Sequence, residues 1–181
     1  MTSTTITHEI PPVWNSQSRI LILGTMPSPA SRDAGFFYMH PQNRFWKVVP
    51  KVFDEELKYS NSDTKILELK PQGIQERRDF LLSHNIALWD VLSSCDINGA
   101  SDASIKNAMP NDFTEILSNS KITKVFCTGK TAYNLWNKFC KEKYEVQFNL
   151  TTECLPSTSP ANAAWSFERL VEIYRKIAES F

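Results

Sequence analysis

A chain of 181 residues has the length of one domain and can bury a real hydrophobic core. Its 41% hydrophobic and 22% charged residues are ordinary for a globular protein, and no apolar run approaches the roughly 20 residues of a membrane span. The formal net charge is zero, which argues against a uniformly basic surface for a polyanion, although a local basic face would suffice for transient contact.

The first 18 residues are rich in threonine and serine and contain Pro11 and Pro12 shortly before Trp14. This composition predicts a poorly ordered arm over residues 1–18 that docks through the tryptophan, followed by a single domain over residues 19–181. No basic start followed by an apolar stretch is present. We therefore expect no secretory signal and a cytoplasmic protein, or a nuclear one in a eukaryotic cell.

Short apolar runs that end at turn residues predict the strands. The clearest run is Ile20-Leu21-Ile22-Leu23, which Gly24 stops, and similar runs predict strands over residues 86–90, 122–127 and 146–154. Apolar residues at helical spacing predict helices over residues 45–57, 71–83, 130–143 and 167–178. The second of these helices is expected to turn Arg77 outward. Strands that alternate with helices predict an α/β fold of three αβα layers, with a four-stranded parallel sheet flanked by helices.

Loops that follow parallel strands gather at one edge of their sheet. Residues 24–43, 93–102, 128–129 and 156–162 are therefore predicted to line one crevice. The first of these loops contains three consecutive aromatic residues, Phe36, Phe37 and Tyr38. They cannot all face one core, because neighbours on an extended chain point in opposite directions. At least one ring is a candidate for stacking on a flat ligand.

Two segments carry a family resemblance. Residues 24–48, GTMPSPASRDAGFFYMHPQNRFWKV, resemble the first motif of the uracil-DNA glycosylase superfamily, most closely in its hypoxanthine-DNA glycosylase branch and next in the mismatch-specific uracil/thymine glycosylases. Residues 155–162, LPSTSPAN, resemble the second motif. The resemblance implies the fold of that superfamily. It also implies a DNA repair enzyme that flips out a deaminated base, hypoxanthine or uracil, and excises it by hydrolysing the N-glycosidic bond.

The same resemblance assigns Asn43, in the HPQN run, to positioning the water that attacks the sugar. Asparagine is also a favourable helix cap, so the alternative role of Asn43 is to cap a helix that begins at Arg44. Tyr38 matches the ring that stacks on the flipped base, with a core position as the alternative. His40 is a candidate donor to the base or to a phosphate, or else a structural histidine.

The glycine turn is expected to present backbone N–H groups of Thr25 and Met26 to the base, next to Gly24. Related branches have Asn or Asp where this chain has Met26. A thioether can neither orient nor deprotonate water. Two alternatives follow: the catalytic role has moved to Asn43, or the protein is not a competent glycosylase.

The second motif predicts a contact with the DNA backbone. Ser159 precedes Pro160, a combination typical of a helix N-cap and first turn. Ser157, Thr158 and Ser159 would then hold a phosphate at a helix N-terminus. Asn162 is expected to probe the gap left by the flipped nucleotide. The alternative is a capped helix start without a ligand.

The four cysteines, Cys95, Cys127, Cys140 and Cys154, include no close pair such as CxxC, so we expect reduced thiols, no metal and no cofactor. The expected partner is DNA with deaminated or mismatched bases, bound by a monomer that has no membrane contact. Two other hypotheses stay open. One is a non-catalytic module for damaged DNA or nucleotides on the same fold. The other is a small-molecule hydrolase, although GxSxG, P-loop and GxGxxG motifs are missing from the sequence.

Overall fold

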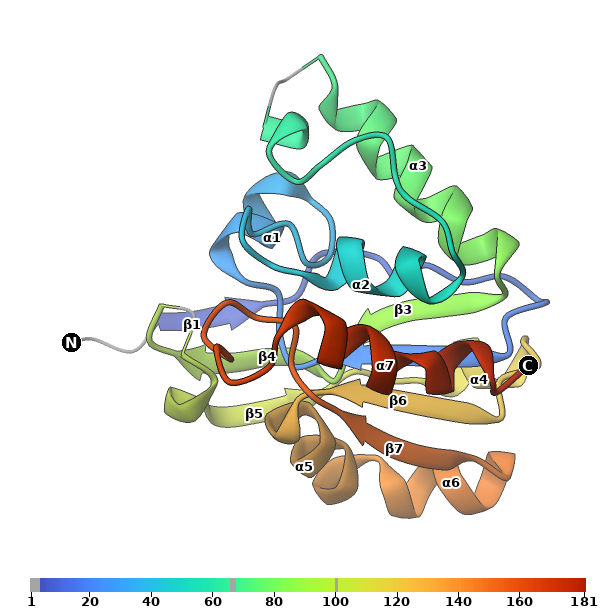
Figure 1. The fold of residues 1–181 in the computed structure, drawn as a ribbon. Helices are drawn as coiled ribbons and strands as arrows, with labels where there is room; N and C mark the ends of the chain where they lie inside the picture. The colour runs from blue at the N-terminus through green and yellow to red at the C-terminus, as the bar shows by residue number, and fades with distance from the viewer. Residues whose placement is uncertain (1–3, 66–67, 100) are drawn as a thin grey trace.

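The computed structural model describes residues 4–65, 68–99 and 101–181. Its central element is a parallel sheet formed by β2 (Ile20–Gly24), β3 (Ile86–Asp90), β6 (Lys124–Thr128) and β7 (Thr151–Leu155) (Figure 1). The strand order is β3-β2-β6-β7, and each neighbouring pair is parallel. The predicted four-stranded parallel sheet is confirmed.

β2 is apolar along its length because both faces of the sheet are covered around it. All five of its residues are buried. Ile20 and Ile22 belong to the hydrophobic core on one face, and Leu21 and Leu23 belong to the core on the other. At its end Gly24 pairs with Asp90 at the end of β3, so the register places these two residues side by side.

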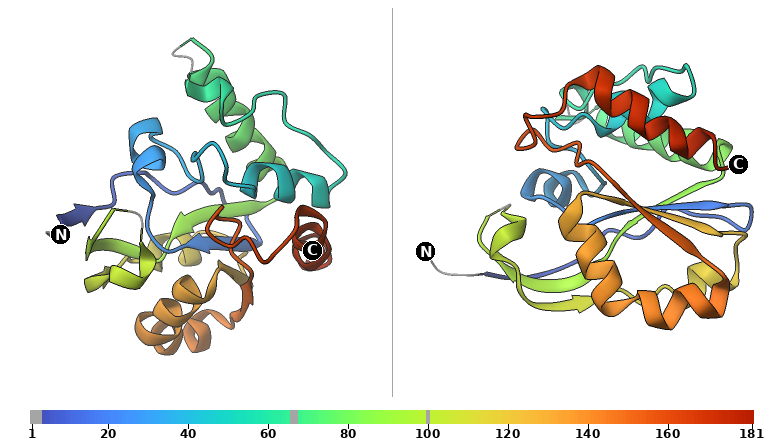
Figure 2. Two further views of the ribbon diagram at one scale, coloured as in Figure 1. Left: turned by 60° about the vertical axis from the view of Figure 1, so that its left-hand side comes forward. Right: turned by 60° about the horizontal axis from the view of Figure 1, so that its bottom comes forward.

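Helices cover both faces of the sheet, which confirms the three-layer αβα fold (Figure 2). One face carries α2 (Phe45–Val52), α3 (Lys70–Ser83) and α7 (Phe167–Ala178); the other carries α4 (Thr114–Ser118), α5 (Lys130–Phe139) and α6 (Lys141–Phe148). The short helix α1 (Pro29–Ala34) lies in the long loop after β2. None of the helices in the described part of the chain combines the length and the apolar character needed to cross a bilayer.

A second sheet, which the sequence analysis does not predict, adjoins the first. Its strands are β1 (Thr4–Thr7), β4 (Leu92–Ile97) and β5 (Lys106–Pro110), in the order β1-β4-β5 with antiparallel pairing. The short 3-10 helices η1 (Asp63–Lys65) and η2 (Asp102–Ser104) lie in loops. The sequence analysis treats residues 93–102 as a polar loop, because a short strand with one exposed face has little apolar pattern.

Residues 4–18 do not form the poorly ordered arm that their composition predicts. β1 pairs with β4, and Val13 forms a bridge with Leu88 of β3. Ile10 and Val13 are buried in the core, and Trp14 packs partly buried against the opposite core. Pairing with distant strands thus fixes a segment whose local sequence has no strong preference.

Three predicted boundaries differ from the structure. The helix expected over residues 45–57 ends at Val52, and Asp54 has a left-handed φ of 58°. The helix expected over residues 130–143 divides at Cys140 into α5 and α6. Because α6 continues to Phe148, the strand expected over residues 146–154 begins only at Thr151.

Candidate active site

A cavity of about 580 Å³ opens at the edge of the parallel sheet where its strands end. All ten residues proposed for the site from the sequence line it: Gly24, Thr25, Met26, Tyr38, His40, Asn43, Ser157, Thr158, Ser159 and Asn162. The two motifs therefore meet in space although more than a hundred residues separate them. Asp90 and Thr128, at the ends of β3 and β6, also line this cavity, which we call the base cavity.

Gly24 forms the tightest point of the base cavity. A Cβ atom at this position would lie 2.2 Å from Oδ1 of Asp90 and 2.9 Å from the hydroxyl oxygen of Tyr38. Both distances are below van der Waals contact, so only a residue without a side chain leaves room for the carboxylate and the phenol. The glycine that ends β2 thus lets two functional groups converge.

Tyr38 forms one wall of the cavity, whereas Phe36 belongs to the core and Phe37 is a core residue that touches the cavity. One face of the Tyr38 ring stacks on Phe45, with ring centroids 3.9 Å apart and planes at 4°. Its hydroxyl lies 2.8 Å from Oγ1 of Thr128, whose own proton is donated to the carbonyl of Leu23. Tyr38 is therefore the donor. Burial, followed by the charge of Asp90, raises the pKa of Tyr38 well above its usual value, so the phenol stays protonated.

The backbone beneath Tyr38 is supported by a buried polar network. Tyr38 has a φ of 56°, in the left-handed region that is strained for a tyrosine. Nδ2 of Asn61 donates to the carbonyls of Tyr38 and His40, at 3.0 and 2.9 Å. Arg77 in turn donates to Oδ1 of Asn61 at 3.0 Å and to the carbonyl of Tyr59 at 2.9 Å. The network holds the segment that presents the stacking ring.

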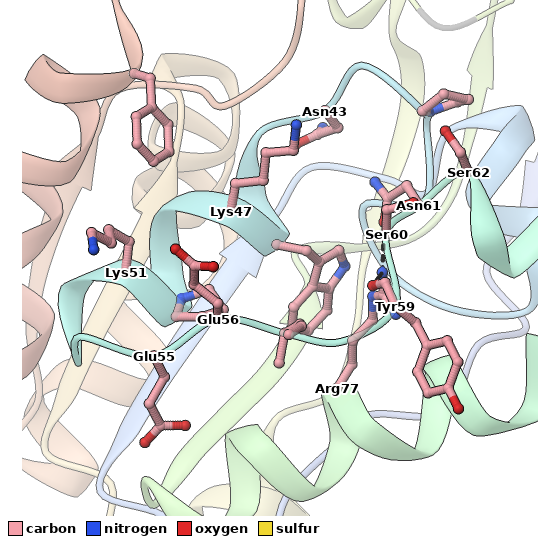
Figure 3. A pocket seen from close by; sticks show the side chains of 15 residues that line it. Asn43, Lys47, Lys51, Glu55, Glu56, Tyr59, Ser60, Asn61, Ser62 and Arg77 are labelled. Atoms are coloured by element: carbon pink, nitrogen blue, oxygen red, sulfur yellow. Dashed lines mark hydrogen bonds between the residues drawn. The ribbon is translucent and has the colours of Figure 1, made fainter.

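Arg77 is fully buried, so the predicted outward orientation is wrong. Burial lowers the pKa of its guanidinium to about 10. Its side chain rises from α3 toward Tyr59 and Asn61 at a second cavity of about 360 Å³ (Figure 3). This neighbouring cavity shares Asn43 with the base cavity and has Lys47 and Lys51 of α2 along its wall. One arginine of the Arg77-Arg78 pair in a polar stretch gave no sequence signal for burial.

Asn43 connects the first motif to the second. Its Oδ1 accepts the backbone N–H of Phe45 at 3.0 Å and the hydroxyl of Thr158 at 2.8 Å. The first bond satisfies the free N–H at the start of α2, but the helix begins one residue later than the predicted cap requires, with Arg44 and not Asn43 at its N-cap position. Because both donors need an oxygen acceptor, they also fix the orientation of the amide, with Nδ2 as its remaining donor.

Arg44 shapes the loop of the second motif. Its guanidinium donates to four backbone carbonyls, those of Thr158, Ser159, Asn162 and Trp165. Three of these carbonyls also accept a backbone N–H, that of Thr158 from Arg44 and those of Ser159 and Asn162 from residues 162 and 165 in turns. Residues 156–166 accordingly form a loop, and α7 begins only at Phe167 with Ser166 as its N-cap. The prediction of a helix N-terminus at Ser159 is wrong, although the predicted residues do line the cavity.

Asp90 is the main residue of the cavity that the sequence analysis missed. Its Oδ2 lies 2.9 Å from Nε2 of His8, and the two side chains are 6% and 1% exposed. Oδ1, above Gly24, receives no hydrogen bond from any residue that the structure describes. A carboxylate at the end of an apolar strand was the available signal, because strand ends of parallel sheets face the ligand crevice.

Two further polar groups complete the rim. Oγ1 of Thr25 donates to Oδ2 of Asp102 at 3.0 Å. Partial desolvation in the cavity, and then the charge of Asp90, raise the pKa of Asp102. Nδ1 of His40 accepts the backbone N–H of Gln42, so the proton of a neutral His40 ring is on Nε2. The cavity thus has acceptors at its floor and donors along its wall.

Several known proteins are similar to this chain in sequence or fold. The sequence model of the Uracil DNA glycosylase superfamily matches residues 11–178. A protein named hypoxanthine DNA glycosylase from Methanosarcina acetivorans is 30% identical over 166 residues, covering 91% of this chain and 93% of the relative. One of the same name from Methanosarcina barkeri is 32% identical over 104 residues, or 58% of each chain.

Structural comparison agrees with the sequence matches. The solution NMR structure of a uracil DNA glycosylase candidate from Methanosarcina acetivorans matches with a TM-score of 0.71 at 24% identity. The match covers 97% of this chain and 99% of that chain, which shows a common fold. Together with the family match along nearly the whole sequence, the observations establish that this chain belongs to the uracil DNA glycosylase superfamily.

Proposed function

We propose that this DNA glycosylase flips deaminated bases out of DNA, hypoxanthine in preference to uracil, and releases them by hydrolysis of the N-glycosidic bond. The observation that carries the proposal is Oδ1 of Asp90 at the floor of the base cavity. Deamination converts a ring nitrogen of adenine or cytosine from an acceptor into an N–H donor. A fixed carboxylate oxygen accepts this N–H and repels the lone pair of the undamaged base.

Size and stacking support a base as the ligand. The volume of about 580 Å³ falls in the range of small-molecule sites. One face of the Tyr38 ring is covered by Phe45, so a flipped base would stack on the opposite face. Guanine and thymine also carry a ring N–H. Correct pairing protects guanine and thymine from excision, because flipping costs least free energy for mismatched or damaged bases.

The loop of the second motif would hold the DNA backbone next to the flipped nucleotide. Oγ atoms of Ser157 and Ser159 accept the backbone N–H groups of residues 159 and 161, which leaves their hydroxyl protons for phosphate oxygens. Nδ2 of Asn162 is bonded to the carbonyl of Ser157, so it would probe the vacated position in the stack only after that bond opens. The proposed grip consists of hydroxyl groups on a loop.

Hydrolysis needs a held water and stabilisation of the departing base, whose charge is negative. Nδ2 of Asn43 is the proposed group for the water, since its oxygen is already bonded to Phe45 and Thr158. Backbone N–H groups of Thr25 and Met26 and Nε2 of His40 are proposed for the charge on the base. Lysine is absent from the described residues that line the base cavity, which favours direct hydrolysis over a covalent amine intermediate.

Base release from duplexes that each contain one altered base tests the proposal. Under single-turnover conditions we expect release of hypoxanthine, slower release of uracil, and none of paired adenine. Asp90→Leu keeps the branching at Cγ and removes the acceptor, so it should lower hypoxanthine release by about 10- to 100-fold. Binding without release of any base would instead support the non-catalytic module.

The role of Asn43 requires a variant that separates water positioning from capping. Asn43→Ala removes both functions. Asn43→Ser keeps an oxygen that can accept the N–H of Phe45, because serine is also a good N-cap, but it lacks the amide. We expect Asn43→Ser to keep the melting temperature and to lose most hypoxanthine release. Unchanged release in Asn43→Ser would leave capping as the role of this residue.

A further inference from the structure

We propose that His8 is a positioning residue that fixes the carboxylate of Asp90 in the orientation that reads the flipped base. The inference rests on the proposed function. His8 precedes residue 11, where the match to the superfamily begins, so the family comparison says nothing about this residue. The N-terminal segment that contains His8 would then contribute to the function of the base cavity.

Backbone pairing on both sides of His8 fixes its position. Thr7, directly before it, pairs with Ser94 of β4, and the N–H of His8 donates to the carbonyl of Ser93 at 2.7 Å. Farther along, Val13 exchanges two backbone hydrogen bonds with Leu88 of β3, at 3.0 and 2.8 Å. One end of the segment is thus hydrogen-bonded to the second sheet and the other end to the parallel sheet, which fixes the backbone position of His8.

The ring of His8 is enclosed by aromatic residues. Its centroid lies 6.0 Å from that of Phe37 and 6.2 Å from that of Trp89, which meets it edge-on. Its side chain is 1% exposed, and Nε2 points to Oδ2 of Asp90 at 2.9 Å. A buried carboxylate requires a donor of this kind, because an unpaired buried charge is strongly unfavourable.

The bond from His8 decides where Asp90 places its free acceptor. Because Nε2 of His8 holds Oδ2, the plane of the carboxylate is fixed and Oδ1 stays above Gly24, where it can accept the N–H of a deaminated base. Without His8 the carboxylate can turn about its Cβ–Cγ bond, and Oδ1 then leaves this position. His8 therefore keeps the acceptor of Asp90 in place.

Two substitutions separate this role from packing. His8→Phe retains an aromatic ring between Phe37 and Trp89 but has no donor. His8→Gln places an amide N–H near the position of Nε2. The matched control is His84→Phe, since His84 also pairs with a carboxylate, that of Glu55, and lies between Phe53 and Phe80 away from the base cavity.

Each variant is assayed for single-turnover release of hypoxanthine, for binding to a duplex with a tetrahydrofuran abasic-site analogue, and for thermal melting. For His8→Phe we expect hypoxanthine release to fall by about 10- to 100-fold, with abasic binding unchanged. His8→Gln should recover most of the rate, and His84→Phe should match the wild type.

Recovery of the rate in His8→Gln is a readout that a packing role would not move. Phenylalanine, and not glutamine, retains the ring between Phe37 and Trp89, so a packing role would make His8→Phe the milder variant. Wild-type release by His8→Phe, or an equal loss of abasic binding, would overturn the inference.

Failure of the proposed function can be distinguished from failure of the His8 proposal. If the wild type released no base, the glycosylase proposal would fail. The role of His8 would then be tested by measuring, with fluorescence anisotropy, the binding of duplexes that contain hypoxanthine or adenine. Loss of a preference for hypoxanthine in His8→Phe would then support its positioning role, and persistence of that preference would refute it. A wild type with no preference at all would overturn both proposals.

Discussion

Replacing Arg44 should uncouple the second motif from the rest of the site. Arg44→Ala removes four side-chain hydrogen bonds to the carbonyls of Thr158, Ser159, Asn162 and Trp165. The guanidinium is only half-buried and the carbonyls can regain water, so we take about 0.5–1 kcal/mol for each bond. The free energy of unfolding should then fall by about 2–4 kcal/mol, and the melting temperature by about 5–15 °C.

Thermal and urea unfolding of three variants measure this effect. Arg44→Lys keeps the positive charge, but a compact ammonium group cannot reach carbonyls spread over residues 158–165, so it should recover less than half of the loss. Arg175→Lys on the exposed face of α7 is the matched control and should resemble the wild type. Binding of abasic DNA should weaken in Arg44→Ala, because the loop lines the base cavity.

The outcome that would refute this reasoning is specific. If Arg44→Ala melted within about 2 °C of Arg175→Lys, the substitution would have lowered the free energy of unfolding by less than about 1 kcal/mol. The four hydrogen bonds from Arg44 could then not be the interactions that hold the loop. Full recovery of the unfolding stability in Arg44→Lys would show that a positive charge at this position is sufficient to hold the loop. Either result would require another explanation for the loop at residues 156–166.

Three further predictions concern the cavity floor, the buried arginine and pH. Gly24→Ala places a methyl group 2.2 Å from Oδ1 of Asp90, so this variant should lose most hypoxanthine release in single-turnover assays. Release at the wild-type rate by Gly24→Ala would show that the carboxylate moves freely. Arg77→Met removes the hydrogen bonds that the guanidinium donates to Gly73, Tyr59 and Asn61, so the free energy of unfolding should fall by about 2–4 kcal/mol. Urea unfolding measures this loss, and an unchanged midpoint would contradict the prediction. Hydrogen bonds from Thr114 and Tyr144 hold the pKa of Asp112 below its usual value, so the stabilisation is present above about pH 4 and lost as pH falls. The melting-temperature difference between wild type and Asp112→Ala should therefore narrow in acid, and a constant difference would count against this linkage.

The parallel sheet could be predicted because its signals are local. The Ile-Leu-Ile-Leu run ended by Gly24 specifies a strand wherever both faces are covered, and the stripe of α7 specifies a helix in the same way. Once the strands were placed, topology brought the loops that follow them to one edge. Hence the predicted site residues gather in one cavity, even though the helix predicted at Ser159 does not form.

The second sheet shows where local signals end. β4 buries only Leu92, Cys95 and Ile97, and neither β5 nor β1 contains a fully buried residue. Such strands exist because each completes the hydrogen bonding of a neighbour. The N-terminal segment was assigned to a poorly ordered arm for the same reason, since only its partner strand gives it structure.

The sequence by itself determined the strands of the parallel sheet, their alternation with helices and the group of residues at the sheet edge, because apolar periodicity and glycine turns act over a few neighbouring residues. Only the tertiary structure decided the polar bonds around the cavity: His8 to Asp90 across 82 positions and Arg44 to Ser159 across 115. These are pairings of single polar groups from distant segments. Their energies depend on burial and orientation, which exist only after the layers have packed.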